Sequence, residues 1–183
     1  ISKRETPSLK LTHGEWIGKR WGWMYFNQEL SDITFNGLTI IDSKETMQLL
    51  DFYQDEQDKK RFLLMAPDTL NSGKAILNIE SVLFKEDTLL FNGKINFRVP
   101  TKIDTTHVKK IQPESTVKIR LEKDGGPTIP IVFGKPIIDV SDSAFFMAAD
   151  SDTVMVDVDW INPIEIDFIP PKGWIEKTKY TFI

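Results

Sequence analysis

The side chains that most often act as nucleophiles, general bases or metal ligands are few in this sequence. His13 and His107 are its only histidines, and each lies in a polar stretch. A serine triad would need one of them as its base, and no Gly-x-Ser-x-Gly motif presents a nucleophilic serine. Cysteine is absent, which excludes a thiolate metal site, a cysteine nucleophile and disulfide bonds. We therefore predict no cofactor and no nucleophilic catalysis.

Carboxylates on two successive segments are the candidates for acid–base or metal chemistry. Val154–Trp160 and Ile164–Phe168 alternate apolar with other residues at period two, and Asn162-Pro163 marks a turn between them. One face of this hairpin would carry Asp157, Asp159, Glu165 and Asp167. Such a group could bind a hard cation such as Ca²⁺, or supply the carboxylate pair of a glycoside hydrolase. A solvated sheet face explains the same pattern, and we favour it over a metal site.

The best functional candidate is the aromatic segment Leu11–Phe26, which holds three of the five tryptophans. In a strand, Trp21, Trp23 and Tyr25 would share one face. Exposed rings at this spacing form a platform suited to a sugar ring or an apolar ligand, and nearby cations add affinity for anions. The predicted ligand- or partner-binding residues are Trp16, Lys19, Arg20, Trp21, Trp23 and Tyr25. The alternative, which the usual burial of tryptophan favours, is that the indoles belong to the core.

Gly14-Glu15-Trp16 lies near the start of this β-rich chain and resembles the Gly-x-Trp motif that opens lipocalin-type barrels. The resemblance covers three residues. It implies a barrel whose floor is closed by Trp16 and whose cup holds a small apolar ligand. The sequence departs from the usual lipocalin order at Asp42–Phe62, where a predicted helix comes too early.

The segment expected to organise the fold is an antiparallel meander over Gly73–Pro100. Asn92-Gly93 separates two apolar runs, and this dipeptide suits a two-residue hairpin turn because it tolerates positive φ. The turn would make Leu90 and Ile95 cross-strand neighbours. Lys85-Glu86-Asp87 would reverse the chain once more. Asn36-Gly37 predicts a second hairpin of the same kind.

One helix is predicted, over Asp42–Phe62. Asp42 and Glu45 have the spacing of a capping box, in which each side chain satisfies a free backbone N–H group at the helix start. Apolar residues then recur at partial helical spacing, at Met47, Leu50, Phe52 and Tyr53. Phe62–Ala66 is either the end of this helix or a short buried strand.

Further alternating segments, with turn signals between them, indicate many short strands. We predict an all-β fold, a mostly antiparallel β-sandwich or partly closed barrel, with one amphipathic α-helix. Residues 1–10 would form a flexible N-terminal tail, and residues 11–183 a single β-rich domain. A domain break near Thr101–Pro113 is the alternative.

Composition narrows the function classes. The 183 residues are 40% hydrophobic and 27% charged, which is ordinary for a globular protein. The net charge of −4 argues against a general nucleic-acid binder. No run of about 20 apolar residues exists, so no transmembrane helix is predicted.

These observations together predict a non-catalytic β-rich module for binding or assembly, outside the cytoplasm or within a larger complex. Its partner would be a protein or an apolar or sugar-like ligand, and an oligomer is compatible with the sequence. Two alternatives remain open: a lipocalin-like barrel that carries a small apolar or sugar-like ligand, and a carbohydrate-active enzyme with paired carboxylates. An extracytoplasmic location, periplasmic or secreted, is favoured over a cytoplasmic one.

Overall fold

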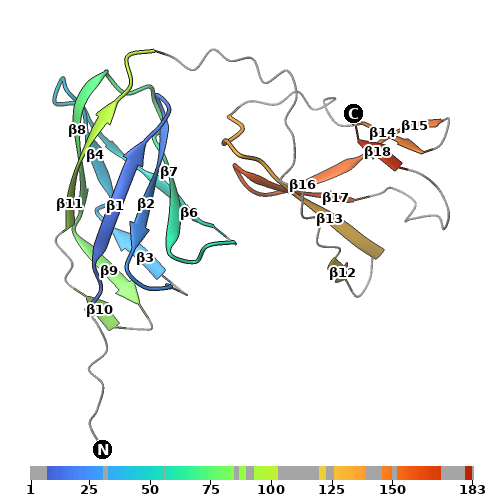
Figure 1. The fold of residues 1–183 in the computed structure, drawn as a ribbon, viewed down its shortest axis with the longest axis horizontal. Helices are drawn as coiled ribbons and strands as arrows, with labels where there is room; N and C mark the ends of the chain where they lie inside the picture. Colours follow the sequence, from blue (N-terminus) through green and yellow to red (C-terminus); the bar gives the residue numbers. More distant parts are fainter. Residues whose placement is uncertain are drawn as a thin grey trace, which may run out of the picture. The chain divides into compact units, whose positions relative to one another are not determined.

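A computed structural model shows an all-β chain in which every paired strand runs antiparallel to its neighbour. The structure describes residues 8–30, 33–55, 57–84, 87–89, 93–102, 120–122, 126–138, 146–149, 152–169 and 180–182. These ranges contain 18 strands and no helix, so the predicted all-β antiparallel class is confirmed. The chain divides into two compact units, Ile1–Thr105 and Thr106–Ile183 (Figure 1). This boundary falls within Thr101–Pro113, the alternative break.

The first unit is a β-sandwich of two four-stranded sheets (Figure 1). One sheet has the order β1-β2-β7-β6, with bounds Leu11–Trp16, Trp21–Phe26, Arg61–Met65 and Asp51–Gln54. The second has the order β11-β8-β4-β5, with bounds Gly93–Val99, Gly73–Ile79, Thr39–Ile41 and Met47–Leu49. The first unit also contains a three-stranded sheet. Its order is β10-β9-β3, with bounds Asp87–Leu89, Ser81–Phe84 and Ile33–Asn36.

The core of this unit lies between the two four-stranded sheets. Met24 and Phe62 point into it from one sheet, and Ile40 and Leu77 from the other. Aromatic rings fill its middle, and the rings of Phe35 and Phe62 meet edge to face with centroids 5.3 Å apart. Full burial of each such side chain is worth about 1.5–3 kcal/mol. Burial of the inward-pointing apolar residues of both sheets therefore contributes substantially to the stability of the sandwich.

The predicted helix over Asp42–Phe62 is wrong, because this segment forms β5, β6 and the start of β7. The capping-box residues build a hairpin turn between β4 and β5 instead. Asp42 accepts the backbone N–H groups of Lys44 and Thr46, as a helix cap would. Glu45 then adopts a left-handed conformation with φ of 63°, which returns the chain to pair with β4. An aspartate that bonds the following backbone is common to caps and turns, so the motif alone does not separate them.

The predicted turn at Asn36-Gly37 is also wrong. For the turn predicted at Asn92-Gly93, Gly93 begins β11 and pairs with Ile79 of β8, while Leu90 and Asn92 lie outside the described residues. β3 and β4, on either side of Gly37, pair with β9 and β8, so the chain continues here rather than reversing. Gly37 does adopt the expected positive φ, of 62°, but at an irregularity between two strands. The reversal predicted at Lys85-Glu86-Asp87 is confirmed, because β9 and β10 pair antiparallel around it.

The second unit contains two small antiparallel sheets. One has the order β12-β13-β17-β16, with bounds Arg120–Glu122, Gly126–Val132, Glu165–Ile169 and Asp157–Asn162. The other has the order β15-β14-β18, with bounds Asp152–Met155, Phe146–Ala149 and Tyr180–Phe182. The hydrophobic core of the second unit comprises Ile131, Phe133, Val156, Ile166 and Phe168. The hairpin predicted around Asn162-Pro163 is formed by β16 and β17.

Three further expectations concern the ends and the surroundings of the chain. Residues 1–7 of the predicted tail lie outside the described residues, whereas Ser8 and Lys10 hydrogen-bond to Asn27. None of the sheets in the described part closes into the barrel that the lipocalin resemblance implies. The described residues also include no helix with the length and apolar character needed to span a membrane.

Candidate functional site

Strand β2 divides the aromatic segment between two faces of its sheet. Met24 and Phe26 belong to the core, so the residues that alternate with them point away from it. These residues are Trp21, Trp23 and Tyr25, and their partners on β7 are Met65, Leu63 and Arg61. We call this side of the β1-β2-β7-β6 sheet, which points away from the core of the first unit, the aromatic face.

The two indoles on the aromatic face are nevertheless buried, with Trp21 at 7% and Trp23 at 6% exposure. They meet edge to face, with ring centroids 6.5 Å apart. The guanidinium carbon of Arg61 lies 4.3 Å from the centre of the Trp23 ring, within the range of a cation–π contact. The β1–β2 loop comes so close to Trp21 that a Cβ atom at Gly18 would collide with its indole nitrogen. Residues of this unit therefore cover much of both rings.

Lys19 and Arg20 anchor that loop rather than extend the aromatic platform. Their carbonyl groups accept the N–H groups of Leu70 and Ala66, at 3.0 and 2.7 Å. The Arg20 Nε donates to the Ala66 carbonyl at 3.1 Å, and the Lys19 ammonium donates to the Ser72 hydroxyl. Both side chains are half-buried, so their visible role is to hold the loop against the segment that follows β7.

Trp16 does not join the other predicted site residues. It lies in the sandwich core, opposite Gly22 in the β1–β2 register, and its ring centroid is 5.9 Å from that of Phe97. Its indole N–H is buried and has no hydrogen-bond partner. Of the six predicted residues, Trp21, Trp23 and Tyr25 therefore lie together on the aromatic face. Trp16 lies on the opposite face, and Lys19 and Arg20 lie in the β1–β2 loop.

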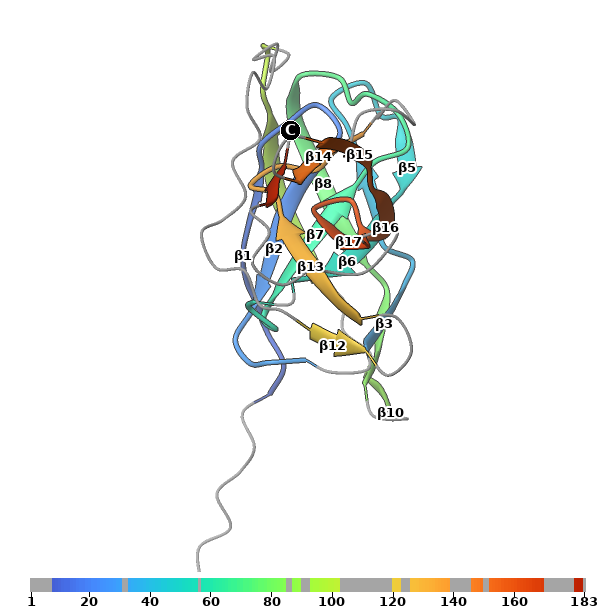
Figure 2. The ribbon, with the colours of Figure 1, turned by 90° about the vertical axis from the view of Figure 1, so that its right-hand side faces the viewer.

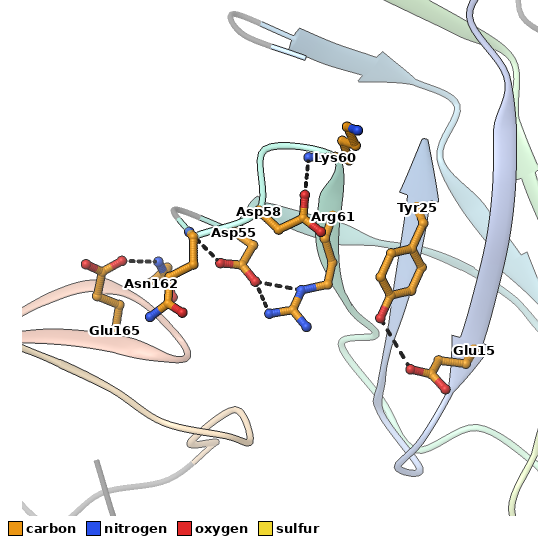
Figure 3. Close-up of polar contacts among 9 residues, drawn as sticks. Glu15, Tyr25, Asp55, Asp58, Lys60, Arg61, Asn162 and Glu165 are labelled. Carbon is orange, nitrogen blue, oxygen red and sulfur yellow. Dashed lines mark hydrogen bonds and ion pairs between the residues drawn. The ribbon is translucent and has the colours of Figure 1, made fainter. Parts of the chain in front are cut away.

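The aromatic face also carries a cluster of polar side chains, whose contacts are drawn in Figure 3. The Tyr25 hydroxyl donates to Glu15 Oε1 at 3.4 Å. Arg61 donates from both Nε, at 2.6 Å, and Nη2 to Asp55 Oδ2. Asp55 is itself buried and also accepts the Gln57 backbone N–H at 2.8 Å. We call Glu15, Tyr25, Asp55 and Arg61 the Tyr25–Arg61 cluster.

Sequence reasoning found Tyr25 but missed the other three members of this cluster. Arg61 and Asp55 fell inside the predicted helix, so the position of Arg61 in β7 and that of Asp55 directly after β6 were not foreseen. The available signal was the short continuous apolar run Phe62–Ala66, which is consistent with a strand buried on both faces.

The electrostatics of the cluster favour binding over proton transfer. Burial raises the pKa of Tyr25, the charge of Glu15 adds to this, and Arg61 opposes it. Burial lowers the pKa of Arg61, but the hydrogen bond and charge of Asp55 outweigh this effect and raise it. Near neutral pH the phenol therefore keeps its proton and the guanidinium its charge. The cluster offers a fixed donor, a fixed cation and two carboxylates beside an aromatic ring.

The acidic residues of the second unit share one face of the β16–β17 hairpin. Asp159 stands directly opposite Asp167, and Glu165 opposite Asn162, whose Nδ2 donates to it at 3.3 Å. Asp157 and Asp159 are exposed, whereas Glu165 and Asp167 are buried, so this is not the fully solvated face that we expected. Within the described ranges, no three acidic, histidine or cysteine residues are grouped so that they could hold a metal ion. His107 lies outside these ranges.

Comparisons with known proteins identify no family for this chain. No family model matches the sequence, and a search of curated proteins finds no match. Among solved structures, the chain is similar to one described as "Crystal structure of S. aureus TarS", at 8% sequence identity and a TM-score of 0.23. The similarity covers 93% of this chain and 36% of that one, so this chain spans about a third of its length. At this TM-score the likeness supports no conclusion about fold or function.

Proposed function

We propose that the chain is a non-catalytic binding module whose first unit recognises a hydroxyl-rich, sugar-like ligand at the Tyr25–Arg61 cluster. The observation that carries the proposal is the half-exposed Tyr25 ring, set beside a charged guanidinium and two carboxylates on one sheet face. Ligand sites combine an apolar or aromatic surface with a few convergent polar groups in this way. The Tyr25 ring would stack on the carbon-bound hydrogens of a sugar, and the charged groups would bond its hydroxyls.

The cluster suits recognition because its members are held before any ligand arrives. Asp55 fixes the Arg61 guanidinium by accepting hydrogen bonds from its Nε and Nη2, and the guanidinium packs on the Trp23 ring. The backbone on either side of Arg61 is fixed too, because its N–H donates to the Asp58 carbonyl at 2.8 Å and its carbonyl accepts the Asp55 N–H at 3.0 Å. A site that is ordered in advance loses less conformational entropy on binding.

The proposed site differs from those of the two alternatives. A lipocalin-like carrier would hold its ligand inside a closed barrel, and the described sheets are open. A carbohydrate-active enzyme would use the paired carboxylates of the second unit. Sugar release from glycans, lost on Asp157→Asn or Glu165→Gln, is the result that would favour the enzyme.

The test is binding of the intact chain to a panel of mono- and oligosaccharides, followed by titration calorimetry on any sugar that binds. We expect Tyr25→Ala to weaken binding by about tenfold or more, as loss of a central contact does. Tyr25→Phe keeps the ring and should have a smaller effect. Asn78→Ala, on the outer side of the other sheet, is the matched control and should bind normally. Equal affinity of wild type and Tyr25→Ala would overturn the proposal.

A further inference from the structure

The other sheet of the first unit exposes an apolar row on its outer side, next to its edge. Met47 and Leu49 of β5 are each 67% exposed, and Ile76 of β8 is 40% exposed. Ile41 of β4 stands opposite Met47 on one side and Ile76 on the other, which completes a row across three strands. Two long apolar side chains this far out of the core are unusual for a single strand of three residues.

The backbone of β5 is equally open on one side. β5 is the last strand in the order β11-β8-β4-β5, and no other strand in the described part pairs with it. Hydrogen bonds from Asp42 N to Thr46 O and from Leu50 N to Leu38 O, each of 3.0 Å, bracket its pairing with β4. Because bonded and non-bonded pairs alternate in an antiparallel ladder, Gln48 bonds to β4. The N–H and C=O groups of Met47 and Leu49 therefore point away from the sheet.

This edge is held in place by contacts on its other side. Gln48 Oε1 accepts the Asp68 backbone N–H at 3.0 Å. Asp42, at the start of the preceding turn, also accepts both N–H donors of Asn71, from the backbone at 2.9 Å and the side chain at 2.6 Å. These hydrogen bonds hold β5 and the turn before it in one conformation. Figure 2 shows the strand in cyan at the margin of the first unit.

We propose that β5 accepts an extended segment of a protein partner, which adds a strand to the edge of the β11-β8-β4-β5 sheet. Strand addition draws affinity from main-chain hydrogen bonds and specificity from alternate side chains. Here the Met47 and Leu49 backbones supply the hydrogen bonds. Their side chains, with Ile76, pack against apolar residues at every second position of the partner.

Charge distinguishes this partner from a second copy of the chain. Exposed carboxylates lie at both ends of the edge, at Glu45 and Asp51. Two copies paired antiparallel around Gln48 would bring the Glu45 end of each edge toward the Asp51 end of the other, and like charges placed close together are destabilising. A partner segment with a basic residue at each end instead forms opposite-charge pairs. This surface lies on the other sheet from the Tyr25–Arg61 cluster, so it does not depend on the sugar-like ligand.

The test uses a fluorescent peptide, Lys-Thr-Val-Thr-Val-Thr-Lys, and its counterpart with glutamate at both ends. We expect the basic peptide to bind the intact chain in an anisotropy titration and to shift the amide resonances of Met47 and Leu49. The double variant Met47→Lys with Leu49→Lys should bind about tenfold more weakly or worse. Ile138→Lys, at an isoleucine in the second unit that is 51% exposed, is the matched control and should bind normally.

Three results would overturn the proposal. One is equal affinity for the two peptides, because the end charges would then not select the partner. Another is unchanged binding by the double lysine variant, because the β5 edge would then not be the site. The third is a wild-type dimer in sedimentation experiments that Met47→Lys dissociates, because the occupant would then be a second copy.

Discussion

The two four-stranded sheets of the first unit both carry apolar side chains on the side that points away from the core. These side chains are buried on one sheet and exposed on the other. Trp21 and Trp23 on the aromatic face are buried, whereas Met47 and Leu49 on the other sheet are among the most exposed large apolar residues described. Both indoles lie on β2, an inner strand paired with β1 and β7, where Arg61 lies over Trp23 and the β1–β2 loop lies against Trp21. The aliphatic pair lies on an edge strand.

The covered pair thus lies on an inner strand and the most exposed pair on an edge strand, although Ile76 of the inner strand β8 is also 40% exposed. A central strand has neighbours on both sides, whose long side chains can fold over a flat ring. An edge strand has a neighbour on one side only, so its apolar residues stay in water unless a partner arrives. The aromatic face thus buries its indoles beside a polar cluster, whereas the β5 edge leaves exposed the apolar pair on which the proposed association rests.

The largest change in the free energy of unfolding is expected at Trp23. Trp23→Ala removes a buried ring and the surface on which Arg61 rests, so we expect the free energy of unfolding to fall by about 3–5 kcal/mol. Met47→Ala should change it by less than about 0.5 kcal/mol, because little packing is lost at an exposed position. Urea denaturation of both variants measures the two values. Similar losses in both would mean that the two outer sides do not differ.

A second test concerns Asp42, which holds the turn that presents the β5 edge. Burial raises the pKa of Asp42, but hydrogen bonds from Asn71, Lys44 and Thr46 outweigh it and lower the pKa from 3.8 to about 2. Because the folded-state pKa is depressed, this carboxylate stabilises the protein above pH 4, by about 2 kcal/mol. That contribution is lost as the pH falls from about 4 to about 2.

The measurement is the unfolding free energy of wild type and Asp42→Asn as a function of pH. We expect the variant to be less stable by about 2 kcal/mol at pH 7 and the two to converge near pH 2. Asp68→Asn, at an exposed carboxylate, is the control and should follow wild type throughout. A difference between Asp42→Asn and wild type that stays constant with pH would contradict the assigned role of the charge.

The smallest expected effect concerns Glu45, in the same turn. Its left-handed conformation is unfavourable for a residue with a Cβ atom, and glycine relieves this strain at some cost in unfolded-state entropy. We expect Glu45→Gly to raise the unfolding free energy by about 0.5–1 kcal/mol. Lys44→Gly, one residue earlier and without positive φ, should lower it. If Glu45→Gly is the less stable of the two, the turn does not have the strained geometry described.

The same turn shows how far local sequence reasoning reached. Asp42 and Glu45 were predicted to begin a helix and form a hairpin turn instead, although the hydrogen bonds that Asp42 accepts are those a cap would make. What followed was a strand, because Met47–Leu49 pairs with β4 and Arg61–Met65 fits between β2 and β6. Pairing between distant segments outweighed a weak local preference for helix.

The candidate site was likewise predicted only in part. Alternation alone placed Trp21, Trp23 and Tyr25 on one face, because side chains in a strand alternate wherever the strand lies. It gave no information on which face the core would occupy, and so could not separate Trp16 from them. Arg61 and Asp55 joined Tyr25 only through β6–β7 and β2–β7 pairing, which links residues far apart in sequence.

The antiparallel all-β class and the period-two faces of the strands were predictable from the sequence, because they follow from the chemistry of neighbouring residues. Which strands are central, which form an edge and which apolar side chains are covered depended on the tertiary structure. It also decided whether Asn-Gly and the Asp-x-x-Glu spacing end as turns, irregularities or caps. Those outcomes depend on partners distant along the chain, whose packing energy exceeds the local preferences of any short motif.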